Sequence, residues 1–155
     1  MSKANTIQTH PLVSVIIPTY NRLEYVQEAI DSVFNQTYDN FELIIIDDGS
    51  TDGTEKCITD KYQGKLTYIC QENKGESAAR NFGLSIARGK YVAFLDSDDK
   101  WRRKKLEIQI KVLDENINKG YVAVASSAFR INENGQKIDH EPVGRAKRLP
   151  RYKIK

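Results

Sequence analysis

Histidine and cysteine are scarce in this sequence. Its 155 residues include two histidines, His10 and His140, and two cysteines, Cys57 and Cys70. So few imidazole and thiol groups argue against a zinc site or a histidine-based catalytic triad, each of which needs these side chains. We expect the cysteines to be small core thiols of a protein in the reducing cytoplasm, with a disulfide as the alternative.

Long apolar runs and phosphate-binding loops are also missing. No uninterrupted apolar run approaches the ~18 residues that a membrane span requires, and residues 1–11 contain no hydrophobic segment of a secretory signal. No G-x-G-x-x-G follows the first expected strand and no G-K-[ST] loop occurs, which argues against a dinucleotide-binding or phosphotransfer domain. The composition, 39% hydrophobic and 29% charged, is typical of a soluble globular domain.

The net charge of +3 is unevenly distributed. Residues 141–155 carry six basic side chains against Glu141, which leaves the rest of the chain at −2. We expect residues 1–10 and 141–155 to be solvated terminal extensions of one domain, residues 11–140, because no linker or repeat interrupts the chain. A basic segment can also contact anionic lipid, so peripheral contact with the inner membrane face is an alternative. No nucleic-acid motif accompanies it, and no nucleic-acid partner is expected.

Apolar runs and helical periodicity alternate along the chain. Four buried strands are expected, over residues 12–17, 41–47, 65–71 and 91–95. Helices are expected from Leu23 to Phe34 and over residues 54–62, 77–87 and 102–116. This order predicts an α/β fold: a three-layer α/β/α sandwich with a largely parallel, Rossmann-like sheet.

Local chemistry predicts several boundaries. Pro18 is expected to end the first strand, and Asn21 to cap the helix that follows, with Glu24 in a capping box. Residues 121–131 are expected to form a fifth extended segment, joined by the turn "NENG" to residues 136–138 as a hairpin.

Polar segments follow three of the expected strands. They are "PTYNR", "DDGSTD" and "DSDD", after the first, second and fourth strands. In open parallel sheets, ligands bind outside the carboxyl ends of the strands, so these segments should converge on one crevice. The middle one imitates a calcium loop, but its twelfth position is Thr59 and a strand precedes it, which excludes an EF-hand. Ser50 and Asp52 are therefore expected to be turn or helix-cap residues.

The segment "DSDD" places three carboxylates in four positions. Oxygen ligands without histidine or thiolate suit Mg²⁺, Mn²⁺ or Ca²⁺ rather than zinc. Mg²⁺ is normally held by one or two carboxylates together with substrate phosphates, which points to a phosphorylated ligand. Strand alternation would place Asp96 and Asp98 on one side and Ser97 on the other, while Asp99 is expected to cap the next helix.

Three further side chains fit such a ligand. Tyr20 could stack on a planar ring, and Asp48 could accept a hydrogen bond from a ring N–H. Arg80 could bind a base carbonyl or a phosphate. Taken singly, Tyr20 could equally be a packing aromatic and Arg80 a salt-bridged surface residue. Their joint placement favours a pocket for a nucleoside diphosphate with its metal.

The same residues resemble the family 2 glycosyltransferases of GT-A fold. The resemblance rests on "VSVIIPTYNR", "QTYDNFELIIIDDGSTDGT", "NKGESAARNFGLSIARGKYVAFLDSDDKW" and, more weakly, "FRINENGQKI". It implies a nucleotide-sugar donor, often a UDP-sugar, with Mn²⁺ or Mg²⁺. The segment 96–98 looks like the DXD motif of the family, which would place Asp98 on the metal and Asp96 on the ribose or metal, with Ser97 between them. The remaining donor-binding residues implied by the resemblance are Pro18, Thr19 and Tyr20 along the base, Asp48 bound to it, and Arg80 at the base or phosphate.

The resemblance also implies an inverting transfer to a polysaccharide, lipid-linked or protein-glycan acceptor. Such a transfer needs a carboxylate base. Members of the family usually continue for another hundred residues or so, with an acidic catalytic motif that is not found up to Lys155. Asp139 and Glu141 cannot be assigned to that role. We therefore expect the donor-binding part of a glycosyltransferase, with a non-catalytic nucleotide-sugar and metal-binding module as the alternative.

Overall fold

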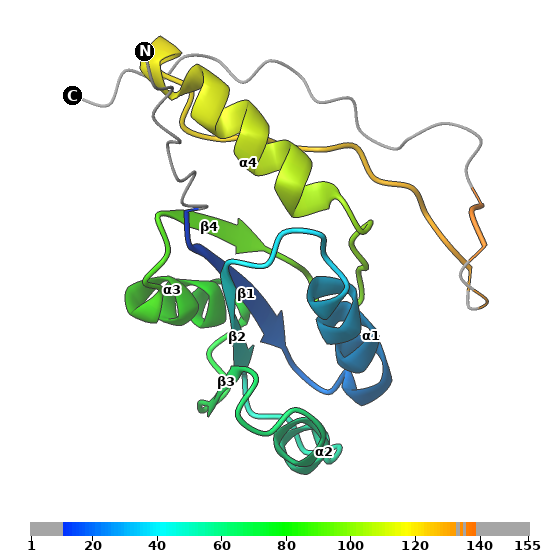
Figure 1. Ribbon diagram of the computed structural model, residues 1–155. Coiled ribbons are helices and arrows are strands. Elements are labelled where there is room, and N and C mark those ends of the chain that lie inside the picture. Colours follow the sequence, from blue (N-terminus) through cyan, green and yellow to red (C-terminus); the bar gives the residue numbers. More distant parts are fainter. Residues whose placement is uncertain (1–10, 133, 135, 139–155) are drawn as a thin grey trace, which may run out of the picture. The chain divides into compact units, whose positions relative to one another are not determined.

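The structure is a computed structural model that describes residues 11–132, 134 and 136–138 (Figure 1). The chain divides into two compact units after Glu107. The first unit contains the whole sheet, and the second begins within a long helix. In the part of the chain that is described, no helix combines the length and apolar character needed to cross a bilayer.

The first unit is built on a four-stranded sheet in which all neighbouring strands are parallel. The strands are β1 (Val13–Thr19), β2 (Phe41–Asp47), β3 (Thr67–Cys70) and β4 (Tyr91–Phe94), in the order β3-β2-β1-β4. All seven residues of β1 are buried. Strands covered on both faces are expected to be continuously apolar, which is why β1 and β2 are readable from sequence.

Helices cover the two faces of this sheet. Figure 1 shows α1 (Leu23–Phe34) on one face and α3 (Glu76–Ile86) on the other, with α2 (Thr54–Lys61) following β2. Right-handed crossovers require this, because the chain moves outward from β1 to β3 and then returns past β1 to β4. Gly83 lets α3 approach closely, since a Cβ there would lie 2.5 Å from Cγ2 of Ile16. The predicted α/β/α sandwich is confirmed.

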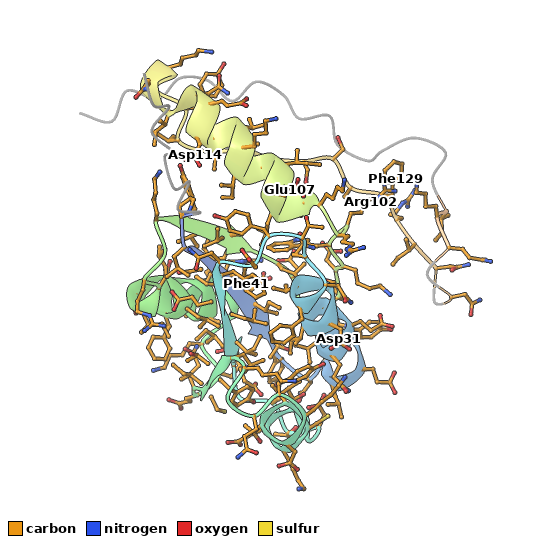
Figure 2. All side chains as sticks on the ribbon, viewed as in Figure 1. Asp31, Phe41, Arg102, Glu107, Asp114 and Phe129 are labelled. Atoms are coloured by element: carbon orange, nitrogen blue, oxygen red, sulfur yellow. The ribbon has the colours of Figure 1, made fainter. Side chains whose placement is uncertain are left out.

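Apolar side chains fill both sides of the sheet (Figure 2). Ile16, Ile44 and Ile46 form a buried cluster with Ala79 of α3. Side chains alternate along a strand, so the neighbouring residues of β1 and β2 face the other helix layer. There the ring of Phe41, which starts β2, has its centroid 6.2 Å from that of Phe34 at the end of α1.

Pro18 lies within β1, so the prediction that it ends the strand is wrong. The amide of Leu95 donates to the carbonyl of Ile16, whereas the amide of Asp48 donates to the carbonyl of Thr19. Even-numbered residues of β1 therefore pair toward β4 and odd-numbered ones toward β2. Because β4 pairs only as far as Ile16, the missing N–H of Pro18 points where no ladder continues.

The start of α1 also differs from the prediction. Asn21 does not cap the helix, and no side chain caps it from the N-cap position. Asn21 adopts a φ of 49°, and its Oδ1 accepts a hydrogen bond from the amide of Thr51 at 2.8 Å. Asp52 supplies the missing acceptor: its Oδ2 binds the amide of Leu23 at 3.1 Å, and its Oδ1 binds the amide of Thr54. The expectation that Asp52 is a cap residue is confirmed, but it serves two helices.

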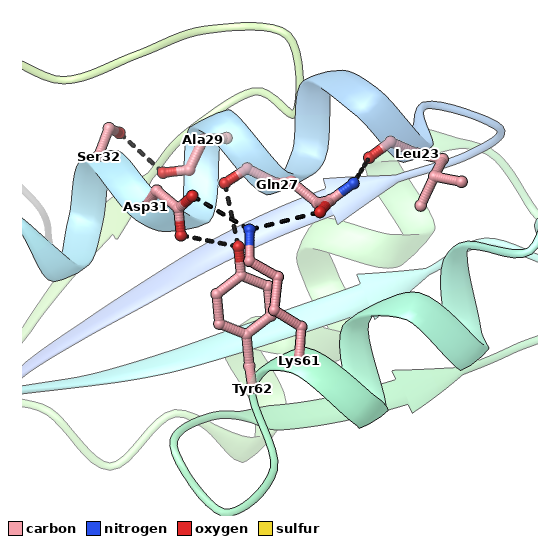
Figure 3. A network of polar contacts seen from close by, with 7 residues as sticks. All are labelled: Leu23, Gln27, Ala29, Asp31, Ser32, Lys61 and Tyr62. Carbon is pink, nitrogen blue, oxygen red and sulfur yellow. Dashed lines mark hydrogen bonds and ion pairs between the residues drawn. The ribbon is translucent and has the colours of Figure 1, made fainter.

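A polar network joins α1 to the end of α2 (Figure 3). The hydroxyl of Tyr62 donates to Oδ1 of Asp31 at 2.7 Å, and Nζ of Lys61 lies 3.2 Å from Oδ2 of the same carboxylate. Burial, together with the Asp31 carboxylate, raises the pKa of Tyr62 to about 12. The phenol therefore remains a donor at neutral pH.

A second network fixes the entry into β4. Ser14 donates to Oε1 of Glu42 at 2.6 Å, and Arg88 binds the other oxygen at 2.7 Å. Burial opposes the charge of Glu42, but these hydrogen bonds outweigh it and lower the pKa of the carboxyl. The amide of Gly89 donates to the Ser14 hydroxyl at 2.8 Å, an approach so close that a Cβ at residue 89 would clash.

The cysteines are only partly as expected. Both are free, but Cys70 is exposed and Cys57 is partly buried. The core-thiol prediction is therefore wrong for Cys70, because it ends β3, which is an edge strand.

The second unit contains the rest of α4 (Lys105–Asn116) and the 3-10 turn Ile117–Lys119. Residues 121–131 are not a strand, which corrects the fifth-strand prediction. A strand needs a neighbour for its backbone groups, and these residues show isolated bridge positions alone, such as the bridge from Ile131 to Lys137 among the described residues. The amide of Asn132 donates to the carbonyl of Gln136 at 2.9 Å, so the predicted hairpin is confirmed in minimal form.

Candidate functional site

A cleft opens at the carboxyl ends of β1 and β4. The strand order reverses here, because the chain runs outward from β1 to β3 and then returns to β4 on the other side of β1, which makes this position the topological switch point where α/β proteins bind ligands. The cleft has a volume of about 510 Å³, which suits a small organic ligand. Its lining consists of Pro18, Thr19, Tyr20, Arg22, Asp48, Asn73, Gly75, Glu76, Ala79, Asp96, Ser97 and Asp98.

Seven of the eight residues singled out from sequence line this cleft. The eighth, Arg80, does not line it but is bonded to two residues that do. The structure therefore brings the three strand ends together as expected, while the role of each residue remains a prediction. Arg22 belongs to the segment "PTYNR" that was expected at the crevice but was given no role, and the lining residues that sequence reasoning missed are Asn73, Gly75, Glu76 and Ala79. Applying the strand-end rule to "NKGE" after β3 as well would have found three of them.

Asp48 is buried, with 4% of its surface exposed. Its Oδ1 accepts hydrogen bonds from the side-chain amide of Gln71 at 2.7 Å and the amide of Lys74 at 2.9 Å, and its Oδ2 accepts one from the amide of Gly75 at 2.7 Å. Burial disfavours the ionised form of Asp48, but the three hydrogen bonds stabilise that form more strongly, so the pKa of the carboxyl is lowered. Asp48 therefore stays ionised and holds the loop before α3 against the end of β2.

Thr19 has a buried hydroxyl at the wall of the cleft. The residue is 3% exposed, and within the described part of the chain its Oγ1 has no hydrogen-bond partner. An unsatisfied buried hydroxyl is costly, so a polar ligand atom in the cleft would be a favourable partner. Tyr20, the next residue, is 48% exposed and presents its ring at the opening.

The acidic segment after β4 forms a tight turn. The amide of Asp99 donates to the carbonyl of Asp96 at 3.0 Å, and α4 begins only at Lys105. Asp99 therefore closes this turn, and the prediction that it caps the helix is wrong. Asp96 and Asp98 are exposed and Ser97 is buried, as alternation predicts, although all three line the cleft.

Asp96 and Asp98 differ in their partners. Asp96 forms an ion pair with Arg80 at 2.7 Å, whereas Asp98 has no hydrogen bond or ion pair within the described residues. Burial and then the carboxylates of Asp96 and Asp98 raise the pKa of Asp99. Asp99 is therefore exposed to the negative charge of both neighbouring carboxylates.

These residues fit a divalent cation held jointly with a phosphate ligand. The lining carries four carboxylates against one guanidinium group, that of Arg22, which leaves a net charge of −3. Among the described residues, no group of three or more potential ligand side chains could hold a metal by itself. Mg²⁺-like ions need only one or two carboxylates when phosphate and water complete the shell, and Asp98 and Asp96 supply such oxygens.

Comparison with known proteins identifies the chain. The sequence model of the family described as "Glycosyl transferase family 2" matches residues 14–154. The chain belongs to glycosyl transferase family 2. The resemblance inferred from the motifs is thereby confirmed.

Relatives of this family 2 glycosyltransferase chain are longer than it is. An uncharacterized glycosyltransferase of Rickettsia felis is 46% identical over 144 residues, covering 88% of this chain and 23% of the relative. The UDP-Glc:alpha-D-GlcNAc-diphosphoundecaprenol beta-1,3-glucosyltransferase WfgD of Escherichia coli is 42% identical over 106 residues, covering 68% and 42%. The chain therefore spans about a quarter to two fifths of the length of these relatives.

Solved structures of similar glycosyltransferases confirm the fold. TarS residues 1–349 of S. aureus, in complex with UDP-GlcNAc, superposes with a TM-score of 0.61 at 32% identity, covering 76% of this chain and 38% of TarS. The mannosyltransferase PcManGT of Pyrobaculum calidifontis, in complex with GDP-Man and Mn²⁺, gives a TM-score of 0.61 at 31% identity, covering 68% and 33%. The expected GT-A fold is thus shown, and members that use nucleotide sugars share it.

Proposed function

We propose that this chain binds a UDP-sugar together with Mn²⁺ or Mg²⁺ and provides the donor half of an inverting sugar transfer. The observation that carries the proposal is the cleft at the switch point, with a net charge of −3 in its lining and an Asp98 that is unpaired within the described residues. A diphosphate alone would be repelled there, whereas a diphosphate with a divalent cation would be attracted. The S. aureus and Pyrobaculum complexes, with UDP-GlcNAc and with GDP-Man and Mn²⁺, support this ligand class.

The proposed roles follow the positions of the side chains. Asp98, and Asp96 beside it, would hold the cation. When bound, that cation supplies a Lewis acid that stabilises negative charge on the departing diphosphate. Ser97, which is buried between the two exposed carboxylates, would line the donor site with them.

The base would bind along β1. Pro18 and Thr19 would line its pocket, with the unpartnered Thr19 hydroxyl as a hydrogen-bonding group and the exposed Tyr20 ring as a stacking surface. Asp48 would accept a ring N–H, sharing its oxygens with the loop that it already holds. Arg80 would reach the base or a phosphate after leaving part of its present ion pairing.

For the acceptor, we propose only a chemical class. The E. coli relative is named for an acceptor sugar linked to diphosphoundecaprenol, which supports a lipid-linked glycan as one acceptor class. We propose that the reaction takes place in the cytoplasm, at the inner face of the membrane. Asp139, Glu141 and the basic residues 141–155 lie outside the described residues, so neither the acceptor base nor a membrane contact is assigned to a position.

Calorimetric titration of the 155-residue chain tests this function. UDP is expected to bind in the presence of Mn²⁺ and much more weakly in its absence, and NAD and ATP are expected not to compete. GDP serves as the comparison that distinguishes a uracil pocket from a guanine pocket. Absence of Mn²⁺-dependent binding of either nucleotide would overturn the proposal. Binding without sugar transfer to any acceptor would instead support the alternative of a non-catalytic binding module.

A further inference from the structure

Arg80 is shared between two carboxylates at the mouth of the cleft. Its Nη2 atom lies 2.6 Å from Oε1 of Glu76 and 2.7 Å from Oδ1 of Asp96. The Glu76 contact runs along one turn of α3, whereas the Asp96 contact joins α3 to the turn after β4. One guanidinium nitrogen therefore holds two carboxylates from different elements.

Only one of the two carboxylates, Asp96, belongs to the proposed cation site. Asp96 belongs to the same turn as the unpaired Asp98, so a cation bound there would compete with Arg80 for the Asp96 oxygens. Glu76 starts α3 and lines the cleft, with 60% of its side chain exposed. The donor-site roles proposed above leave it without a function.

We propose that Glu76 is a positioning residue that sets how strongly nucleotide binding depends on the cation. This inference rests on the proposed function. The negative charge of Glu76 partly neutralises the Arg80 guanidinium. Arg80 therefore offsets less of the negative charge of Asp96, and Asp96 attracts a cation more strongly. Glu76 also adds a negative charge to the cleft, which disfavours a diphosphate that arrives without a cation. Both effects make nucleotide binding depend more strongly on the cation.

The variant Glu76→Gln separates this role from a merely structural one, because it keeps the side-chain length and removes the charge. Mn²⁺ alone is expected to bind it more weakly than the unchanged chain. UDP alone is expected to bind more tightly. The ratio of UDP affinities with and without Mn²⁺ should fall about fivefold, the scale that a partly exposed ion pair supplies. A structural role would instead lower both UDP affinities together and leave the ratio unchanged.

Asp60→Asn is the matched control. Asp60 pairs with Lys56 at 2.8 Å in the same i,i+4 arrangement on α2, and neither residue lines the cleft. The ratio of UDP affinities with and without Mn²⁺ should be the same in Asp60→Asn as in the unchanged chain. MnCl₂ and UDP are titrated separately and together into the full 155-residue chain, and circular dichroism melting checks that each variant is folded.

The outcomes distinguish the two proposals. A ratio in Glu76→Gln within about twofold of the unchanged chain overturns the role of Glu76, while Mn²⁺-dependent UDP binding by the unchanged chain leaves the proposed function standing. If the unchanged chain binds no nucleotide, both proposals fail. Should Glu76→Gln melt at a clearly lower temperature, Glu76→Ala must show the same fall in the ratio, and an unchanged ratio there also overturns the inference.

Discussion

Two acidic clusters lie at the carboxyl ends of β2 and β4, on either side of β1 in the same sheet, yet their surroundings are opposite. Asp47 and Asp48 at the end of β2 are 0% and 4% exposed, and both carboxylates are occupied by hydrogen-bond donors. Asp96 and Asp98 after β4 are exposed, and Asp98 has no partner within the described residues. Buried carboxylates with full hydrogen bonding serve the fold, whereas an exposed, unpaired one beside like charges is available to a cation.

The physical cause of the difference is sheet position. β2 is flanked by β1 and β3, and the loop before α3 folds over its carboxyl end. β4 is an edge strand within the described sheet, and it ends at Phe94 before the acidic turn begins. Similar aspartates therefore acquire different roles according to what packs over them, and the following predictions test that contrast.

Asp98→Asn should have the largest effect on ligand binding. We expect the affinity for UDP in the presence of Mn²⁺ to fall by about 100-fold or more, because the variant replaces a charged metal ligand by a neutral amide. Calorimetric titration measures the loss, and the melting temperature should stay unchanged. Asp99→Asn, which alters the neighbouring carboxylate outside the cleft lining, is the control and should retain binding. Unchanged affinity in Asp98→Asn would contradict the metal role.

Asp48→Ala should have the largest effect on stability. It removes the buried acceptor of three hydrogen bonds, two of them from backbone amides of the loop before α3, and so releases that loop from the end of β2. We expect the free energy of unfolding to fall by about 2 to 4 kcal/mol, measured by urea denaturation. In the same experiment Asp98→Asn should change it by less than about 0.5 kcal/mol, as for other exposed positions. Equal destabilisation by the two variants would remove the contrast between the clusters.

Acid should lower the free energy of unfolding by protonating the Asp48 carboxylate. Hydrogen bonds hold the pKa of Asp48 below its ordinary value despite burial. A carboxyl with a lowered folded-state pKa contributes stability above its unfolded value of about 3.9, and this contribution is lost as the pH falls through the folded value. Urea denaturation between pH 7 and pH 3 should therefore show a steeper acid loss in the unchanged chain than in Asp48→Asn. If the free energy of unfolding falls equally with pH in both proteins, the lowered pKa of Asp48 is contradicted.

Tyr68→Phe should give the smallest of these effects. The phenol of Tyr68 donates to Oδ2 of Asp47, and burial followed by that hydrogen bond raises its pKa. Removing the hydroxyl leaves Asp47 with the amide of Ser50 at 2.8 Å as a donor. A loss of about 1 kcal/mol in the free energy of unfolding is expected, with UDP affinity unchanged. Tyr62→Phe, which loses the bonds to Asp31 and to the carbonyl of Gln27, serves as a comparison outside the cleft lining.

Much of the donor site was predictable because it follows from strand positions. Apolar runs mark the central strands, and parallel order brings the segments after β1, β2 and β4 to one edge. Seven of the eight candidate residues therefore line the cleft. The residues after β3 were missed because only three strand ends were considered, although the same rule applies to Asn73 and Gly75.

Contacts between distant residues were not predictable in the same way. Asp52 caps α1 across 29 residues, displacing the local candidate Asn21, and Arg80 reaches Asp96 across 16 residues. Residues 121–131 have strand-like composition, but a strand forms only where a neighbouring backbone completes its hydrogen bonds. Each of these outcomes depends on which groups come within about 3 Å of one another in three dimensions, a distance set by hydrogen-bond geometry.

The sequence by itself determined the α/β/α sandwich, the family and the location of the cleft, since periodicity and strand order act through local and topological rules. Only the tertiary structure decided which carboxylates are occupied. Asp48 is enclosed by the loop 71–75, Asp96 is paired with an arginine that Glu76 shares, and Asp98 is left open. The reason is that the availability of a charge depends on the donors packed around it, and those donors come from elements far away in the chain.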